Sequence, residues 1–227
     1  MKRVITTLLA ALLVLSLAAC GSRVETKKLA GTWTCTIDVT DRMNAAAEQA
    51  LGLSAADGAA KMPLQLVLTV TEDGAYTLRY DSDAVRTALD AYAAALHPAA
   101  VESVYAAAEE QGLSREEYDA AMEKAGITMD DMVAAIFAGV DEEELLSLLT
   151  GRSAAITGYC RAEGGQLYLA DTAADLAETA DCLSYTLSDG TMTWTDAQGE
   201  LSSQLTEQEQ ELLRVPLTWT KQAEESK

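Results

Sequence analysis

The side chains that could carry acid–base chemistry in this chain are adjacent carboxylates. They occur at Glu109-Glu110, Glu116-Glu117, Asp130-Asp131 and Glu142-Glu143-Glu144. Two carboxyl groups that share a cleft can act as general acid and general base, which is the chemistry of a hydrolase. Most of these groups, however, fall in the first turn of a predicted helix, where they favour the helix dipole and stay hydrated. The pattern therefore favours a structural role for the acids and predicts no catalytic residue.

Motifs for nucleophilic, phosphate or metal chemistry are absent from the sequence. The chain has one histidine, His97, and no Cys-x-x-Cys or His-Glu-x-x-His motif. Zinc and haem sites need several such ligands at fixed spacing. We therefore expect no cofactor and no metal site. His97 directly precedes Pro98, and this pair predicts the end of a helix with His97 as its C-terminal cap.

Cys20 has the clearest chemistry of the four cysteines. It follows Lys2-Arg3, an apolar run over residues 4–15, and the small residues of Leu17-Ala18-Ala19. This order resembles a bacterial lipoprotein signal. The resemblance implies cleavage before Cys20, a lipid thioether on its sulfur, and an extracytoplasmic chain anchored to the bacterial cell membrane. Residues 1–19 are then the signal peptide, and residues 20–29 are the lipidated cysteine and a polar tether.

The other three cysteines allow at most one intramolecular disulfide in an oxidising compartment. Cys160 and Cys182 are the pair nearest in sequence, and a bridge between them would restrict the unfolded chain. Strand alternation argues the other way. Cys160 is in phase with the apolar Ile156, whereas Cys182 is out of phase with Leu183, Tyr185 and Leu187, so the two cysteines would face opposite sides of a sheet. A Cys160–Cys182 bridge and three reduced thiols, the third being Cys35, both stay open.

Net charge limits the choice of partners. The chain carries 16 basic and 36 acidic residues, for a net charge of −20. Loss of Lys2 and Arg3 with the signal makes the mature chain more negative still. Such a surface repels polyphosphate, so nucleic acid is excluded as a partner. The remaining length is ample for one domain with a decorated core or for two small ones.

Alternation of apolar and polar residues predicts strands at both ends of the chain. Residues 31–39 alternate around Trp33, and residues 64–71 and 75–80 flank the turn signal Glu72-Asp73-Gly74. Two further hairpins are expected over 155–170 and 182–196, with a closing strand over 215–220. The count is about eight strands, which we assign to a β domain over 30–81 and 151–222.

The segment between these strands has helical periodicity instead. Residues 82–150 form the predicted helical insertion, in which one apolar stripe ends at His97-Pro98 and another begins at Val101. Three later helix starts share one order of residues, a glycine, an apolar residue and a capping residue: Gly112-Leu113-Ser114, Gly126-Ile127-Thr128 and Gly139-Val140-Asp141. Ser114 with Glu117 predicts a capping box. A further helix is expected near residues 41–53 and another from Thr206 to Leu213.

These elements predict an α+β fold, an antiparallel meander or small barrel with a helical insertion between strands. Gly31 and Trp33 on the first strand, the hairpin order and Lys221 behind the last tryptophan resemble a lipocalin-like barrel. The resemblance implies that Trp33 plugs one end of the barrel and that Lys221 packs over it. An open twisted sheet packed against the helices is the alternative architecture.

One phase of the strands would line the interior of such a barrel. The candidate ligand-lining residues are Tyr76, Tyr80, Tyr185, Met192 and Trp194, because aromatic faces with a polar group suit small-ligand sites. The competing interpretation is a barrel filled by its own side chains. We expect a non-enzymatic, membrane-anchored lipoprotein that binds a small apolar ligand or an envelope protein partner. The alternative is an envelope hydrolase that acts on cell-wall or lipid substrates through carboxylates.

Overall fold

The computed structural model of the chain describes residues 25–53, 61–137, 155–179, 181–198 and 213–223. They belong to two compact units, which we treat separately. The barrel unit comprises residues up to Cys35, residues 66–80 and residues from 154 onward, and the helical unit comprises residues 36–65 and 81–153. Strands β1 and β2 contribute residues to both units.

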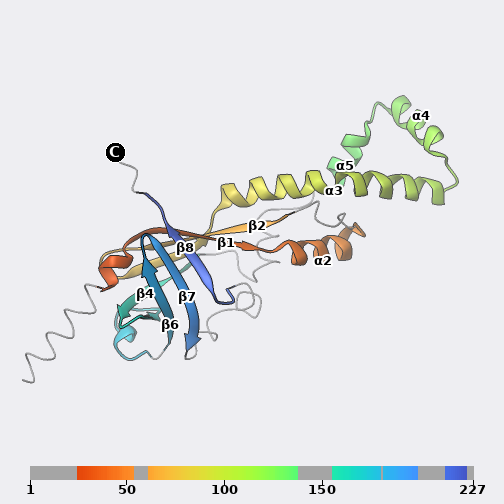
Figure 1. Cartoon of the computed structure of the whole chain (residues 1–227). Coiled ribbons are helices and arrows are strands. Elements are labelled where there is room, and N and C mark those ends of the chain that lie inside the picture. Colours follow the sequence, from red (N-terminus) through yellow and green to blue (C-terminus); the bar gives the residue numbers. More distant parts are fainter. Residues whose placement is uncertain (1–24, 54–60, 138–154, 180, 199–212, 224–227) are drawn as a thin grey trace, which may run out of the picture. The chain divides into compact units, whose positions relative to one another are not determined.

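The strands form a closed antiparallel barrel in sequence order, and the meander is therefore lipocalin-like (Figure 1). The eight strands are β1 Gly31–Asp38, β2 Pro63–Val70, β3 Ala75–Tyr80, β4 Ile156–Glu163, β5 Gln166–Ala170, β6 Cys182–Ser188, β7 Thr191–Gln198 and β8 Leu217–Lys221. Each strand predicted from alternation is present, with bounds that lie within two residues of those expected.

Closure depends on pairs that are remote in sequence. Strand β1 pairs with β8 through Trp33 opposite Lys221 and Thr34 opposite Thr220. Strand β3 pairs with β4 across the helical insertion, with Tyr76 opposite Gly158. Because every strand has two neighbours, the sheet has no free edge. The open twisted sheet, which the sequence left as an alternative, is therefore wrong.

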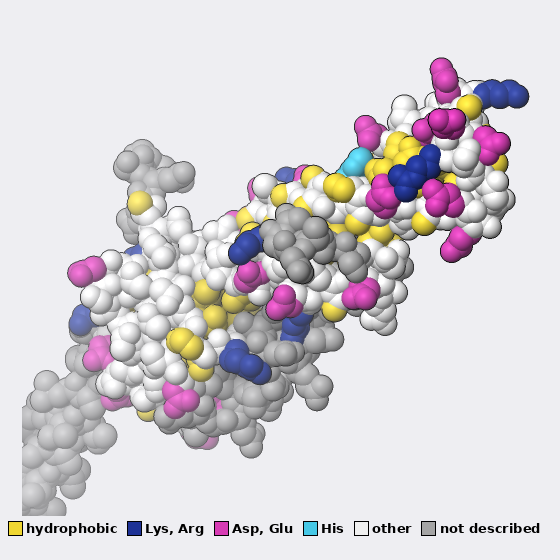
Figure 2. Space-filling model, turned by 45° about the vertical axis from the view of Figure 1, so that its right-hand side comes forward, with side chains coloured by type: hydrophobic (Ala, Val, Ile, Leu, Met, Phe, Trp, Pro, Cys, Tyr) yellow, Lys and Arg dark blue, Asp and Glu magenta, His cyan; other side chains and the backbone are white. Residues whose placement is uncertain are grey.

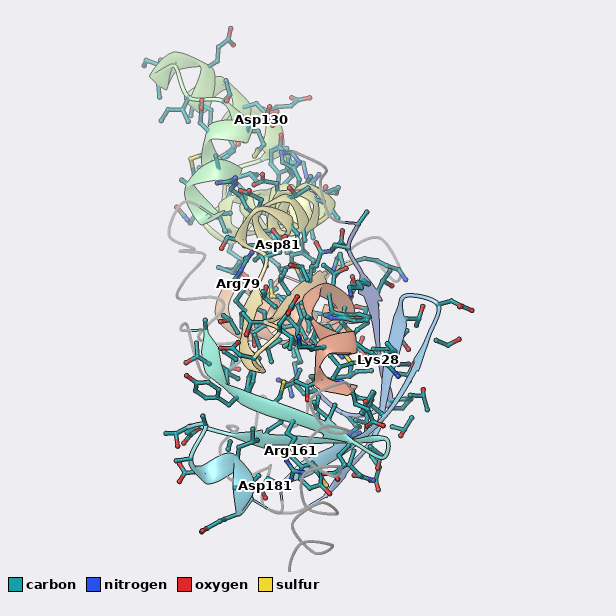
Figure 3. All side chains as sticks on the ribbon, turned by 90° about the vertical axis from the view of Figure 1, so that its left-hand side faces the viewer. Lys28, Arg79, Asp81, Asp130, Arg161 and Asp181 are labelled. Carbon is teal, nitrogen blue, oxygen red and sulfur yellow. The ribbon has the colours of Figure 1, made fainter. Side chains whose placement is uncertain are left out.

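A helical turn over residues 25–29 covers one end of the barrel. Its Thr26 hydroxyl accepts a hydrogen bond from the backbone N–H of Ala162 at 3.0 Å, and the Glu25 carboxylate accepts one from the N–H of Gly164 at 2.8 Å. Leu29, the last residue of this turn, is buried. In Figure 3 the turn that carries Lys28 lies across this end, among the strands. The turn thus ties the start of the described chain to the β4–β5 hairpin.

Helices and their caps make up most of the helical unit. The helices are α2 Thr40–Leu51, α3 Ser82–Glu110, α4 Arg115–Ala125 and α5 Met129–Phe137. The capping box predicted from Ser114 and Glu117 is confirmed at the start of α4. Thr128 plays the same role before α5, where its hydroxyl accepts from the N–H of Asp131 at 3.1 Å. Local side-chain bonds thus satisfy the backbone groups that helix ends leave free.

The helix end predicted at His97-Pro98 is wrong. Helix α3 runs through Pro98 to Glu110, and His97 lies within it, with its Nε2 3.0 Å from Asp130 Oδ1 of α5. A proline inside a helix removes one N–H and leaves the carbonyl of the residue four positions earlier without its partner. That residue is the exposed Ala94, so water can satisfy the carbonyl.

A small apolar core holds the helical unit together. Leu53, Ala100 and Val133 form its buried centre, and neighbouring hydrophobic side chains pack around them. Tyr92 of α3 adds a buried contact to α2, where its hydroxyl donates to Asn44 Oδ1 at 2.7 Å. The cap expected at Asp141 lies outside the described residues, and so does the helix expected from Thr206 to Leu213, apart from Leu213 itself.

Candidate ligand site in the barrel

Strand register identifies the side chains that share the interior face. Residues directly opposite in an antiparallel pair lie on the same face. Trp219 is opposite Met192, Leu217 is opposite Trp194, and Trp194 is opposite Tyr185. Across the β2–β3 pair, Leu66 is opposite Tyr80, Leu68 is opposite Leu78 and Val70 is opposite Tyr76. Across the β3–β4 pair, Leu78 is opposite Ile156 and Tyr76 is opposite Gly158.

The interior face has two sides that differ in exposure. On β7, β8, β1 and β2 most interior residues are buried, with Trp33, Met192 and Trp219 each at 0% exposure, while Ile37 of β1 and Lys221 of β8 are half-buried. On β3 to β6 several interior residues keep solvent contact: Tyr76, Leu78, Tyr80, Ile156, Leu169, Tyr185 and Leu187. The barrel is therefore filled by its own side chains on one side and accessible on the other.

The predicted ligand-lining residues divide between these two sides. Tyr76, Tyr80 and Tyr185 are half-buried on the accessible side. Met192 and Trp194 belong to the packed side, where Trp194 keeps 6% of its surface. Tyr185 and Trp194 are opposite each other on adjacent strands, so the two sides meet at this pair.

The Tyr76 ring packs against Gly158 on the accessible side. A Cβ at Gly158 would lie 2.6 Å from the Ala170 carbonyl oxygen and 2.9 Å from both Cε1 and the hydroxyl oxygen of Tyr76, so this position requires glycine. Burial raises the pKa of Tyr76 to about 12, and it also raises the pKa of Tyr185. Both phenols are therefore neutral at physiological pH and present hydroxyl groups beside apolar surface.

The residues that carry the lipocalin-like resemblance, Gly31, Trp33 and Lys221, lie together at one end of the barrel. Trp33 is fully buried, and its indole N–H donates to the Leu29 carbonyl at 2.7 Å. The Lys221 ammonium lies 5.4 Å from the centroid of the Trp33 ring, within the range of a cation–π contact. A Cβ at Gly31, whose φ is +126°, would meet Lys221 Cε at 2.7 Å. Gly31 therefore admits the lysine that covers the plug.

Two buried indoles on the packed side lack a hydrogen-bond partner. The Nε1 atoms of Trp194 and Trp219 are shielded from solvent and donate to nothing in the described part of the chain. The two rings are neighbours, with centroids 4.8 Å apart and planes inclined at 48°. Sequence reasoning placed Trp194 on the interior face but had no signal for the unpaired N–H groups, because pairing depends on tertiary contacts.

The three cysteines beyond Cys20 are free and buried. The bridge considered between Cys160 and Cys182 is wrong, because the register puts the two residues on opposite faces: Cys160 pairs with Leu169, whereas Cys182 pairs with Tyr168. Burial raises the pKa of Cys160 to about 12. Cys182 instead lies 3.2 Å from Gln166 Oε1 on the outer face.

The paired carboxylates that lie within the described residues are exposed on helices. Hydrogen bonds from Ser114 lower the pKa of Glu117, and those from Thr128 lower the pKa of Asp131. Both acids are therefore ionised caps at neutral pH, whereas a general acid needs a raised pKa. Glu142 to Glu144 lie outside the described residues. Within the described residues, no group of three or more metal-ligating side chains lies together.

Helix α4 presents a surface of a different kind. None of its residues is buried, and Arg115 holds it to α3 by pairing with Glu102 at 2.8 Å and Glu109 at 3.2 Å. Leu113 and Ile127, at the two ends of α4, are 38% and 43% exposed. Figure 2 shows acidic side chains spread over these helices around a patch of hydrophobic ones beside the single histidine.

No family model, curated protein sequence or solved structure matches the chain. Within the described residues, no helix has the length and apolar character needed to cross a lipid bilayer. The lipid-anchor signal up to Cys20 lies outside the described residues.

Proposed function

We propose that the protein is a non-enzymatic bacterial lipoprotein whose barrel binds a small apolar ligand at the extracytoplasmic face of the membrane. The observation that carries the ligand site is the uneven filling of the barrel, in which interior residues of β3 to β6 keep solvent contact. Displacement of water from apolar side chains there, such as Leu78, lowers the free energy of the complex and so favours ligand binding. The neutral Tyr76 and Tyr185 hydroxyls add polar contacts at the same face.

The lipid anchor rests on the residues up to Cys20, which have the charged start, apolar run and small residues of a lipoprotein signal. Metabolic labelling with a fatty-acid analogue tests this part of the proposal. We expect label on the wild-type protein and none on Cys20→Ala. Equal labelling of both proteins would refute the anchor.

The ligand site is tested by titrating the mature chain from Gly21 with N-phenyl-1-naphthylamine, a neutral apolar dye that fluoresces in apolar surroundings. This chain contains every described residue. We expect saturable binding, and a loss of at least about tenfold in affinity for Leu78→Gln, which puts an amide on the interior face.

Thr77→Gln is the matched control, because Thr77 is the neighbouring residue on β3 and points to the outer face, opposite Thr69. We expect it to bind the dye like wild type. Circular dichroism verifies that both variants are folded. Absence of dye binding by the folded wild-type chain, or equal affinity of the two variants, would contradict the interior site.

A second candidate function is favoured by α4, whose residues are all at least partly exposed. Residues 102–131 hold nine acidic and two basic side chains, with Leu113 and Ile127 exposed among them. This combination suits a protein partner that is basic around an apolar centre. Photo-crosslinkers at Leu113 and Ile127 in intact cells would join to such a partner, and Ile127→Glu would abolish the product at Leu113.

A further inference from the structure

The unpaired indoles of Trp194 and Trp219 bear on the kind of ligand that the barrel takes. A buried N–H without an acceptor is destabilising, so buried donors in folded proteins almost always have a partner. Here two such donors lie on adjacent strands, and their rings are 4.8 Å apart. An indole N–H donates in the plane of its ring, so an acceptor atom at the N–H edges of the two rings would satisfy both.

We propose that the barrel ligand is an apolar molecule with an uncharged carbonyl group, and that this carbonyl oxygen accepts hydrogen bonds from Trp194 Nε1 and Trp219 Nε1. This inference rests on the proposed barrel site. The apolar body of the ligand lies along the accessible side, which begins at Tyr185, directly opposite Trp194. The ligand thus passes from the accessible side to the two indoles.

The acceptor is uncharged because the one ammonium group near the site is already engaged. Among the described strand residues, Lys221 is the one basic side chain on the interior face, and its ammonium lies 5.4 Å from the centroid of the Trp33 ring. Trp219 is two residues from Lys221 on the same face of β8, and Trp194 is opposite Leu217, four residues from Lys221. A carboxylate at the indoles would lose its hydration and would pair with Lys221 only at the expense of the contact with Trp33, whereas a ketone, ester or amide loses far less.

The three tryptophans of the chain provide an internal control. Trp33 is also buried in the barrel, but its N–H is already paired with the Leu29 carbonyl. Replacing any tryptophan by phenylalanine removes an indole N–H and keeps an aromatic ring. Only Trp194 and Trp219 should then affect recognition of a carbonyl group.

The test is a titration of the ¹⁵N-labelled mature chain from Gly21, followed through its three indole N–H signals, with each signal assigned from its Trp→Phe variant. The probes are cyclohexanone and methylenecyclohexane, which differ by an oxygen in place of a methylene group. We expect cyclohexanone to move the Trp194 and Trp219 signals downfield and to bind about tenfold more tightly than methylenecyclohexane. Trp194→Phe and Trp219→Phe should each reduce this preference, and Trp33→Phe should retain it.

Equal affinity for the two probes, or binding of cyclohexanone that leaves both indole signals in place, would overturn the carbonyl inference. So would indole signals that are already downfield without ligand and stay there, which indicate a buried water as the acceptor. If N-phenyl-1-naphthylamine binds and neither small probe does, the carbonyl inference is wrong and the proposed ligand site stands. If none of the three molecules binds, both the carbonyl inference and the proposed ligand site are wrong.

Discussion

The barrel and helix α4 are stabilised in contrasting ways. The barrel buries its largest side chains completely, with Trp33 and Trp219 at 0% exposure, and closes by pairing strands remote in sequence. Helix α4 buries no residue and depends on a capping box and on exposed ion pairs of Arg115. Burial of apolar surface contributes far more free energy than exposed ion pairs do. The free energy of unfolding should therefore respond strongly to changes in the barrel and weakly to changes in α4.

The largest effect is expected at the plug of the barrel. Trp33→Ala removes a fully buried ring, its hydrogen bond to Leu29 and its contact with Lys221. We expect the free energy of unfolding to fall by about 3–5 kcal/mol in urea denaturation. Trp33→Phe keeps a ring and should lose less. Equal losses for the two variants would show that the ring is not what stabilises this end.

Replacing one glycine by alanine in each region compares the two regions at similar backbone geometry. Gly74 has φ +92°, and a Cβ there would lie 2.4 Å from the Cys160 carbonyl oxygen. Gly126, after α4, has φ +71° with open space around it. We expect Gly74→Ala to cost about 2–4 kcal/mol, because it adds a backbone clash to the strain, and Gly126→Ala to cost about 1 kcal/mol. Equal melting temperatures of the two variants would contradict this account of Gly74.

Alkaline pH should weaken the barrel through its buried acids. Burial raises the pKa of Cys160 from 9.0 to about 12 and that of Tyr76 from 10.0 to about 12. Because the folded state holds these protons more tightly, the stabilisation is complete below pH 9 and is lost as pH rises toward 12. By about pH 10.5 we expect the free energy of unfolding to have fallen by on the order of 2 kcal/mol because of Cys160.

Urea denaturation at pH 8 and about pH 10.5 measures this loss. Cys160→Ala removes the thiol and should show a smaller decrease between the two pH values than wild type does. The same decrease in both proteins would mean that the thiol does not contribute.

The smallest effect is expected on α4. Arg115→Ala removes two ion pairs and a cation–π contact 4.7 Å from the Tyr105 ring. These groups are exposed, so we expect the free energy of unfolding to fall far less than it does for Trp33→Ala, and less still in 1 M salt. A loss as large as that of Trp33→Ala would make α4 part of the stability core and would remove the contrast.

Local signals in the sequence predicted most of the secondary structure. Alternation around Trp33, the Asp73-Gly74 turn and the Ser114–Glu117 pair each act within a few residues, and each element formed where they indicated. The helix end at Pro98 was predicted by the same local rule and failed, because one lost hydrogen bond beside the exposed Ala94 costs less than ending α3.

The features that define the candidate site were less accessible to sequence reasoning. The β1–β8 pairing, the accessible side of the barrel and the unpaired indoles depend on which strands become neighbours after folding. Periodicity assigned Tyr76, Tyr185 and Trp194 to one face. It could not show that the tyrosines keep solvent contact while Trp194 is buried, because exposure is a property of the closed barrel.

Native mass spectrometry of the mature chain from Gly21 shows directly whether the barrel holds an apolar molecule. The protein would be purified without detergent, incubated with N-phenyl-1-naphthylamine and compared with the same sample after denaturation. We expect a one-to-one adduct, either the dye or an apolar molecule carried from the host, that is lost on denaturation. A folded chain with the same unliganded mass in both states would contradict the proposed ligand site.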